Sequence, residues 1–224
     1  MSEVDLRVVD TAEDASEAAA ALIAEAVGVD CHIALSGGSG PRHAYERAGI
    51  LRPDWSRAEL WWIDERCVPP SDGRSNYRTI RESLLDGLAR EPAEVHRIRG
   101  ELDPEAAAAE YDSALAGVTL DLAFMGIGPD GHTASLFPDA PALDETERRA
   151  VAAEAGLEPF VRRVTMTRPF LATARTMVYL ATGEGKAQAV QRTFAVEPSP
   201  TTPASLVRGR QTIAILDRAA AARL

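Results

Sequence analysis

The segment Gly126–Phe137 combines residue types that suit chemistry on a small molecule. It follows the apolar run Leu120–Met125, which predicts a buried strand, and reads Gly-Ile-Gly-Pro-Asp-Gly-His-Thr-Ala-Ser-Leu-Phe. Glycines let the backbone approach a ligand closely, and a free imidazole titrates at about pH 6.5, where general acid–base catalysis is efficient. We therefore interpret His132 as a candidate general base and Asp130 as the residue that orients its ring.

The glycines of this segment also match the spacing G-x-G-x-x-G, at Gly126, Gly128 and Gly131. In a dinucleotide-binding fold that motif lies in the first turn between a strand and a helix, with an acidic residue about 20 positions later. Here several predicted strands precede it, and Pro129 removes an N–H group that would contact a pyrophosphate. We therefore expect no nicotinamide or flavin, and no other cofactor.

A second glycine-rich segment, Ser36–Pro41, also follows a predicted strand and precedes a predicted helix. The N–H groups of Gly37 and Gly38 and the hydroxyl of Ser39 are candidates for a phosphate cradle. Because such loops are common, the weight of this one comes from its position at a junction between strand and helix.

A third segment, Thr182–Lys186, has the same position, but Ala187 follows where a nucleotide triphosphatase needs Ser or Thr for magnesium. A helix start with a lysine can still hold one phosphate monoester. All 24 basic residues except Lys186 are arginines. Position alone leaves both a phosphate-binding lysine and a solvated lysine at a helix-opening turn open.

The polar segment Asp64–Arg66 and the nearby Asn76 allow two interpretations. In the first, they belong to a loop at the same sheet edge, and Arg66 or Asn76 contacts the substrate. In the second, Arg66 forms a surface ion pair and Asn76 caps a helix. Spacing alone favours the second interpretation.

The remaining histidines and the cysteines indicate no further site. His32, His43 and His96 have no nearby acid or glycine-rich frame, so we expect structural roles for them. No set of His, Cys and carboxylate residues has metal-ligand spacing, and we expect no metal. Cys31 and Cys67 offer one possible pair, and we expect reduced thiols.

The elements that must position these residues alternate between strand and helix. Strands are expected at 6–9, 32–35, 59–63, 95–99, 120–125, 163–167, 177–181 and 212–216, and helices at 12–27, from 41, from 75 to about 88, from 103 and at 186–194, while 138–150 stays unassigned. This alternation is typical of a mostly parallel sheet with helices on both faces. We predict a single three-layer, Rossmann-like α/β domain over residues 1–224, with ligands at the carboxyl ends of the strands.

The composition restricts the partners of the chain. Its formal net charge of −10 and pI near 4.9 argue against a nucleic-acid or anionic membrane surface, so an anionic substrate needs local positive charge. No apolar stretch reaches the roughly 18 residues that cross a bilayer, and the acidic start Met1–Asp5 lacks the basic end of a secretory signal. We expect a cytoplasmic monomer or small homo-oligomer whose partner is a small molecule.

Together these motifs resemble the 6-phosphogluconolactonase family. The resemblance runs in order along nearly the whole chain, through Leu35–Ser39, Asp64–Pro69, Ser75–Tyr77, Gly126–Pro138, Arg163–Thr167 and Thr182–Ala187. It implies the Rossmann-like architecture shared with glucosamine-6-phosphate deaminases and ribose-5-phosphate isomerases. It also implies hydrolysis of 6-phospho-D-glucono-1,5-lactone to 6-phosphogluconate in the oxidative pentose phosphate pathway, without a metal.

The resemblance implies individual roles as well. The catalytic residue is expected at His132, with Asp130 close by. We expect substrate or phosphate contacts from Gly37, Gly38, Ser39, Arg66, Asn76, Arg163 and Lys186. For Lys186 the resemblance favours phosphate binding over a lysine that stands there by chance. Gly40 stands where the family often has Thr, which removes one hydroxyl near the phosphate.

Two other functions remain as alternatives. A glucosamine-6-phosphate deaminase or sugar-phosphate isomerase resembles this chain through Gly126–His132, but the deaminase carries a glutamate five residues after the histidine, where this chain has Phe137. A catalytically silent sugar-phosphate sensor is the other, and the intact Asp130 and His132 argue against it.

Overall fold

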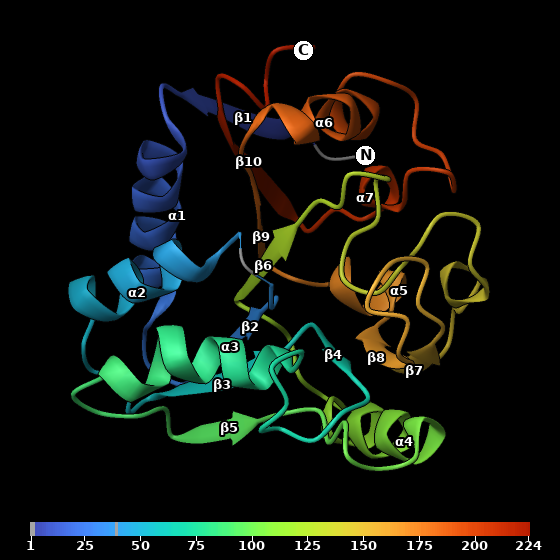
Figure 1. The fold of residues 1–224 in the computed structure, drawn as a ribbon. Helices are drawn as coiled ribbons and strands as arrows, with labels where there is room; N and C mark the ends of the chain where they lie inside the picture. Colours follow the sequence, from blue (N-terminus) through green and yellow to red (C-terminus); the bar gives the residue numbers. More distant parts are fainter. Residues whose placement is uncertain (1–2, 39) are drawn as a thin grey trace.

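The chain folds into two β-sheets with helices around them (Figure 1). The computed structural model describes residues 3–38 and 40–224. The strands are β1 (Val4–Val9), β2 (Cys31–Leu35), β3 (Ala58–Trp62), β4 (Asp64–Arg66), β5 (Glu94–His96), β6 (Leu122–Gly126), β7 (Ala150–Ala153), β8 (Arg163–Met166), β9 (Thr176–Ala181) and β10 (Gln211–Asp217). The helices are α1 (Ala12–Ala26), α2 (Arg42–Leu51), α3 (Asn76–Ser83), α4 (Pro104–Ala114), α5 (Arg168–Leu171), α6 (Ala187–Phe194) and α7 (Pro203–Leu206), with short 3-10 helices η1 (Leu85–Gly87), η2 (Pro141–Leu143) and η3 (Glu184–Lys186).

The main sheet has the strand order β1-β10-β9-β6-β2-β3-β5, and all its neighbouring strands are parallel, as the sequence predicts. From β2 the chain continues through β3 to β5 on one side, whereas β6, β9 and β10 lie on the other. Ligands bind such sheets in the crevice where the strand order reverses, which is here between β2 and β6. Two of the predicted glycine-rich segments follow these strands, so the topology brings Gly37 and His132 to one crevice.

The small sheet is antiparallel, with the order β4-β8-β7. The prediction of a loop at Asp64–Arg66 is therefore wrong, because this segment is β4. Polar residues are typical of an exposed loop, but Asp64 and Glu65 are only 5% and 2% exposed. Buried hydrogen bonds satisfy their carboxylates and allow them to lie in a strand. The strand expected at 163–167 exists as β8, but it pairs in this second sheet, with β7 at its far side.

Three element boundaries also differ from expectation. The helix expected to reach about residue 88 ends at Ser83, because the backbone of Leu84 leaves helical geometry before η1. The strand expected at 95–99 is shorter and forms β5, which ends at His96. Its partner strand β3 ends one residue after Trp61, the residue that pairs with His96. The unassigned stretch 138–150 contains η2 and the first residue of β7.

Local sequence explains where the helices begin. Thr11 and Asp14 form a capping box at α1, in which the Thr11 side chain accepts from the Asp14 N–H and the Asp14 carboxylate accepts from the Thr11 N–H, both at 3.1 Å. Asp103 caps α4, with Pro104 at its first position, and Pro41 is the N-cap of α2. No helix within residues 3–38 and 40–224 is long and apolar enough to cross a membrane.

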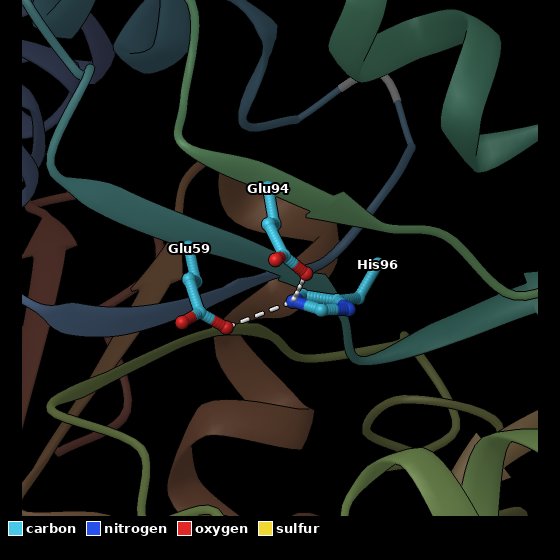
Figure 2. Close-up of side chains that lie close together, drawn as sticks. All are labelled: Glu59, Glu94 and His96. Carbon is cyan, nitrogen blue, oxygen red and sulfur yellow. Dashed lines mark hydrogen bonds and ion pairs between the residues drawn. The ribbon is translucent and has the colours of Figure 1, made fainter.

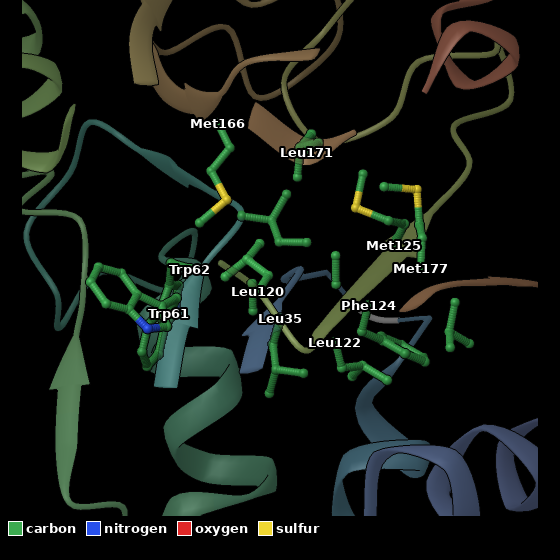
Figure 3. Packing of buried hydrophobic residues seen from close by; sticks show 14 of the residues in the cluster. Leu35, Trp61, Trp62, Leu120, Leu122, Phe124, Met125, Met166, Leu171 and Met177 are labelled. Atoms are coloured by element: carbon green, nitrogen blue, oxygen red, sulfur yellow. The ribbon is translucent and has the colours of Figure 1, made fainter. Parts of the chain in front are cut away.

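One hydrophobic cluster joins the two sheets. Trp61, Trp62 and Phe124 of the main sheet are almost fully buried (Figure 3). Met166, at the end of β8, and Leu171, from α5, pack into the same cluster. Burial of apolar surface stabilises by about 25 cal/mol per Å², so this shared core holds the small sheet against the carboxyl ends of the main strands.

Candidate active site

A pocket of about 310 Å³ lies at the crevice between β2 and β6, where the sequence predicts the ligand. The small sheet and the turn after β9 complete its walls. The sequence-predicted residues that line it are Gly37, Gly38, Arg66, Asn76, His132, Arg163 and Lys186. Asp130 lies behind His132 rather than in the lining, and Ser39 lies outside the described residues.

The His132 ring is oriented by the Asp130 carboxylate. Asp130 Oδ1 accepts hydrogen bonds from Nδ1 of His132 at 2.5 Å and from the His132 backbone N–H at 3.1 Å. Because an ionised carboxylate only accepts, Nδ1 carries a proton, and in the neutral ring the lone pair is therefore on Nε2. Burial alone would raise the pKa of Asp130, but the hydrogen bonds and charge of His132 hold that pKa below its ordinary value. The pair has the geometry of an oriented base.

Gly128 provides the space for this pair. A β-carbon on Gly128 would lie 2.0 Å from Nδ1 of His132 and 2.7 Å from Oδ1 of Asp130. The Gly128 N–H also donates to the His132 carbonyl at 2.8 Å, which closes the loop on itself. Only glycine therefore allows the histidine ring to lie against the backbone here.

The residues after His132 attach the segment Gly126–Phe137 to the small sheet. The buried Ser135 hydroxyl donates to Asp64 Oδ2 at 2.6 Å, and the Ser135 N–H donates to the Thr165 hydroxyl at 3.2 Å. Ala134, which precedes Ser135 in the chain, lines the pocket and has a φ of 53°. This left-handed conformation costs a residue with a β-carbon about 1–2 kcal/mol and persists where the surroundings determine the backbone, which is frequent at functional sites.

Arg66 and Arg163 bring positive charge to the pocket from β4 and β8. They are direct partners in the antiparallel ladder, and both line the pocket. Each has a buried Nε–H without a hydrogen-bond partner among the described residues. Burial, together with the nearby charge of Arg66, lowers the pKa of Arg163, although Asp64 acts against this shift. These unpaired donors suit a bound anion.

A buried carboxylate fixes the segment that carries Arg66 and Asn76. Glu65 is 2% exposed and accepts from the backbone N–H groups of Arg66, Asn76 and Tyr77, each at 2.7 Å, and from the Ser75 hydroxyl at 3.0 Å. Burial raises the pKa of Glu65, and these hydrogen bonds oppose the shift. The start of α3 is therefore held by Glu65 and by its N-cap Ser75.

Asn76 is not the helix cap that spacing alone favours. Its Nδ2 donates to the Asp64 carbonyl at 2.8 Å, and the side chain lies against Gly37, where a β-carbon would approach Asn76 Oδ1 to 2.0 Å. The surface ion pair expected for Arg66 in the same interpretation is also wrong, because its Nη1 donates to the Arg74 carbonyl at 2.7 Å. Both side chains face the pocket instead.

Lys186 reaches the pocket from the turn after β9. Its Nζ donates to the Ile127 carbonyl at 2.7 Å, which leaves two ammonium hydrogens for other partners. Burial lowers the pKa of Lys186, and Asp130 opposes this shift. The turn itself is held by Asp217 at the end of β10, whose carboxylate accepts from the Gly183 N–H at 3.0 Å.

Phe137 packs against both His132 and Arg163 without lining the pocket itself. Its ring centroid is 4.7 Å from that of His132, and the guanidinium carbon of Arg163 lies 5.4 Å from the same ring. The side chain is 3% exposed, and a β-carbon on Gly156 would approach it to 2.7 Å. One apolar ring thus contacts both the imidazole and the guanidinium.

Sequence reasoning missed three residues that build the site. Asp64 lines the pocket, Ser135 anchors the segment Gly126–Phe137, and Glu65 holds the start of α3. Asp64 and Glu65 belong to a quoted motif but looked like loop residues. Ser135 follows His132 closely, yet its partner is 71 residues away in the chain, so only the tertiary structure reveals its role.

The comparisons with known proteins agree with this geometry. A family model described as glucosamine-6-phosphate isomerases/6-phosphogluconolactonase matches residues 5–215. The chain belongs to this family. Within the family, a 6-phosphogluconolactonase of Streptomyces coelicolor is 37% identical over 187 residues, which are 76% of this chain and 72% of the relative. A human 6-phosphogluconolactonase is 39% identical over 160 residues, which are 68% and 62% of the two chains.

Solved structures show the same family fold. The 6-phosphogluconolactonase of Trypanosoma brucei superposes with a TM-score of 0.84 at 27% identity, covering 99% of each chain. A monomeric glucosamine-6-phosphate deaminase superposes with a TM-score of 0.89 at 19% identity, which shows the fold alone. The family resemblance and the α/β fold class predicted from the sequence are confirmed.

Proposed function

We propose that this chain hydrolyses 6-phospho-D-glucono-1,5-lactone to 6-phosphogluconate, the reaction of the oxidative pentose phosphate pathway that its 6-phosphogluconolactonase relatives are named for. The observation that carries the proposal is one pocket with two separate functions in its walls. An oriented imidazole, His132, stands at one side. Two arginines and a lysine stand around the rest.

In the proposed reaction, Nε2 of His132 takes a proton from water while the water oxygen bonds to C1 of the lactone. The bond between C1 and the ring oxygen then breaks, and His132 returns the proton to that oxygen. The sum is the addition of one water molecule. Asp130 keeps Nε2 unprotonated before attack and stabilises the imidazolium during it. Backbone N–H groups of the glycine-rich loops stabilise the oxyanion.

The phosphate of the substrate binds Arg66, Arg163, Lys186 and the backbone of Gly37 and Gly38 in this proposal. Unpaired donors on Arg163 and Lys186 support it, since charge-assisted hydrogen bonds to phosphate are among the stronger ones. In a chain with a net charge of −10, these cations supply the local positive charge that an anionic substrate needs. In the same proposal Asn76 and Asp64, which line the pocket, contact sugar hydroxyls.

Deamination of an amino sugar phosphate is not favoured. The deaminase pattern needs a glutamate at position 137, and a carboxylate there would replace the apolar ring that packs against His132 and Arg163. A catalytically silent sensor is not favoured either, because proton transfer needs the ring orientation that the hydrogen bond between His132 and Asp130 provides, whereas binding alone does not.

The decisive experiment is an assay of lactone hydrolysis above the spontaneous rate, run beside an assay of glucosamine-6-phosphate deamination. His132→Ala should lose about 10²- to 10⁴-fold in kcat and still bind 6-phosphogluconate. His43→Ala, which removes a half-exposed imidazole outside the pocket, is the matched control and should keep full turnover. Near-normal turnover by His132→Ala would contradict the mechanism, and ammonia release would favour the deaminase.

The location and assembly of the chain stay as proposals. We infer a cytoplasmic enzyme from the reduced thiols Cys31 and Cys67 and from the metabolic activity of the family. The state expected from the sequence is a monomer or a small homo-oligomer.

A further inference from the structure

A second cluster of ionisable side chains lies at the edge of the main sheet, away from the pocket (Figure 2). His96 of β5 points its Nε2 at two carboxylates, 2.8 Å from Glu59 Oε2 and 3.4 Å from Glu94 Oε2. One ligand atom from each of the three residues lies within 4.8 Å of the other two. The sequence interpretation that His96 has no nearby acid is therefore wrong in space, because the ladder brings Glu59 beside it.

The two carboxylates of this cluster repel one another. Glu59 and Glu94 are direct partners in the ladder between β3 and β5, and like charges directly opposite destabilise a sheet. Within the described part of the chain, the ion pairs of Glu59 and Glu94 involve histidines and no arginine. In a chain with 24 basic residues, this pair is left without a permanent cation.

The imidazole is held in a fixed orientation. The Trp61 ring stacks on His96 with centroids 3.8 Å apart and planes 12° from parallel. Trp61 Nε1 in turn donates to Nδ1 of His32 at 3.2 Å, which occupies that nitrogen and leaves His32 outside the ligand set. The stacked Trp61 ring therefore restrains the orientation of the His96 imidazole.

The spacing of the ligand atoms fits a small divalent ion. Metal bonds to nitrogen and oxygen of about 2.0–2.2 Å place the ligand atoms of a tetrahedral site about 3.4 Å apart. Glu94 Oε2 lies at this distance from His96 Nε2, whereas Glu59 Oε2 lies at 2.8 Å, in a hydrogen bond that the ion would replace. Imidazole with carboxylates suits zinc and its neighbours in the first transition series better than magnesium or calcium.

We propose that Glu59, Glu94 and His96 bind one divalent transition-metal ion, with zinc as the best fit. Three protein ligands leave further positions for water, so the ion is exchangeable. Its role is structural, because it neutralises the carboxylate pair and ties the edge strand β5 to β3. Glu59 lies near the start of β3, whereas the pocket lies beyond its end, and at about 3.3 Å per residue the two sites are more than 10 Å apart.

His43 shows why a histidine with two glutamates is not sufficient. Its Nε2 lies 4.0 Å from Glu17 and its Nδ1 lies 3.8 Å from Glu46, so the carboxylates approach opposite sides of the ring. No single ion can contact all three residues. His43 therefore serves as an internal control for the geometric argument.

The first test measures zinc binding to the full chain after treatment with a chelator. Calorimetry should give one zinc per chain, and Glu94→Gln and His96→Gln should each weaken binding at least about 100-fold, since loss of even an outer partner costs 10- to 100-fold. Glu94 is 67% exposed, so its replacement leaves folding intact. Glu91→Gln, an exposed acid three residues earlier in the chain, and His43→Gln are matched controls that should bind zinc normally. Unchanged binding by both Glu94→Gln and His96→Gln would overturn the proposal.

The second test uses Trp61 as a reporter. Nickel at the site should quench tryptophan fluorescence in the wild type and in Glu91→Gln, but not in Glu94→Gln, and millimolar magnesium should not compete. The His132→Ala variant separates this site from the pocket: it should still bind zinc, and Glu94→Gln should keep normal lactone hydrolysis. Zinc binding that is lost in His132→Ala and kept in Glu94→Gln would place the ion in the pocket and refute the proposal without affecting the proposed function.

Discussion

Arg66 and Arg163 face each other directly across the antiparallel ladder of the small sheet, and both line the pocket. Two guanidinium groups in this position repel each other, and each has an Nε–H without a hydrogen-bond partner among the described residues. The sheet thus carries a local cost in stability. A phosphate dianion is the ligand that would relieve it.

Replacement of Arg66 by glutamine should separate binding from stability. A hydrogen bond to a charged group contributes about 1.5–3 kcal/mol, so the KM of Arg66→Gln for the phosphorylated lactone should rise about 10- to 100-fold. The KM for unphosphorylated gluconolactone should change much less, and the Tm should stay equal or rise as the repulsion disappears. Kinetics with both lactones and thermal unfolding measure these effects.

Arg74→Gln is the matched control for that variant, because Arg74 pairs with Asp72 at the surface and does not line the pocket. It should leave both KM values unchanged. An equal rise of KM for both lactones in Arg66→Gln would remove Arg66 from the phosphate site.

Lys186→Ala should weaken binding of the phosphorylated lactone far more than that of gluconolactone. The ammonium group is half-buried and bonded to the Ile127 carbonyl, so its charge is fixed in the pocket. Lys186→Arg should restore little, because the planar guanidinium is larger than the compact ammonium that this position holds. Inhibition by inorganic phosphate offers a direct measurement, and full inhibition of Lys186→Ala at the wild-type concentration would argue against the role.

Asp130→Asn should lower kcat by about 10²-fold or more while KM changes little. An asparagine amide can donate to Nδ1 and so place the histidine proton on Nε2, the nitrogen that must accept it. The matched control is Asp139→Asn, at another loop position whose residue does not line the pocket. Equal kcat values for Asp130→Asn and the wild type would show that the ring needs no orientation.

The same variant gives a prediction for acid stability. His132 holds the pKa of Asp130 below its ordinary value despite burial, and an Asp in an unfolded chain titrates at about 3.9. The stability that ionised Asp130 contributes is therefore complete above that pH and is lost as the pH falls through the lower folded pKa. Urea unfolding should show that the wild type and Asp130→Asn differ in free energy of unfolding by about the same amount at about pH 6 and about pH 5. The two free energies should converge below about pH 4. A difference that grows toward acid pH would contradict this sign.

Gly128→Ala should abolish most activity through displacement of His132. The added carbon would lie 2.0 Å from the ring nitrogen, so either the loop or the ring must move. Gly87→Ala, whose added carbon meets nothing within 4 Å, is the control and should be fully active. A low activity of Gly128→Ala together with a folded circular dichroism spectrum supports the interpretation, and normal activity would refute it.

The catalytic part of the site follows from local sequence. Gly37 and His132 come directly after apolar strands, and parallel strands present their carboxyl ends at one edge. The position of Lys186 after β9 follows by the same rule. These segments are recognisable because strand, turn and helix are consecutive in the chain.

The small sheet does not follow from local sequence. β4 and β8 are about 100 residues apart, and the three residues of β4 are all charged, so neither periodicity nor propensity predicts their pairing. Asp64 and Glu65 look solvated until the structure buries them. The proximity of Glu59, Glu94 and His96 likewise depends on strand register, which a sequence does not display. The single domain over residues 1–224 and the role of Ser39 stay predictions.

Ser135 bridges two parts of the enzyme that can diversify independently. Its hydroxyl and N–H reach one residue on each of β4 and β8, which fixes the loop that carries the base relative to the strands that carry the arginines. Changes within β4 and β8 can therefore alter the charge, size or length of the recognised group while the hydrolytic loop stays as it is. In this architecture, substitutions in the two short strands β4 and β8 can change the substrate while the hydrolytic reaction stays the same.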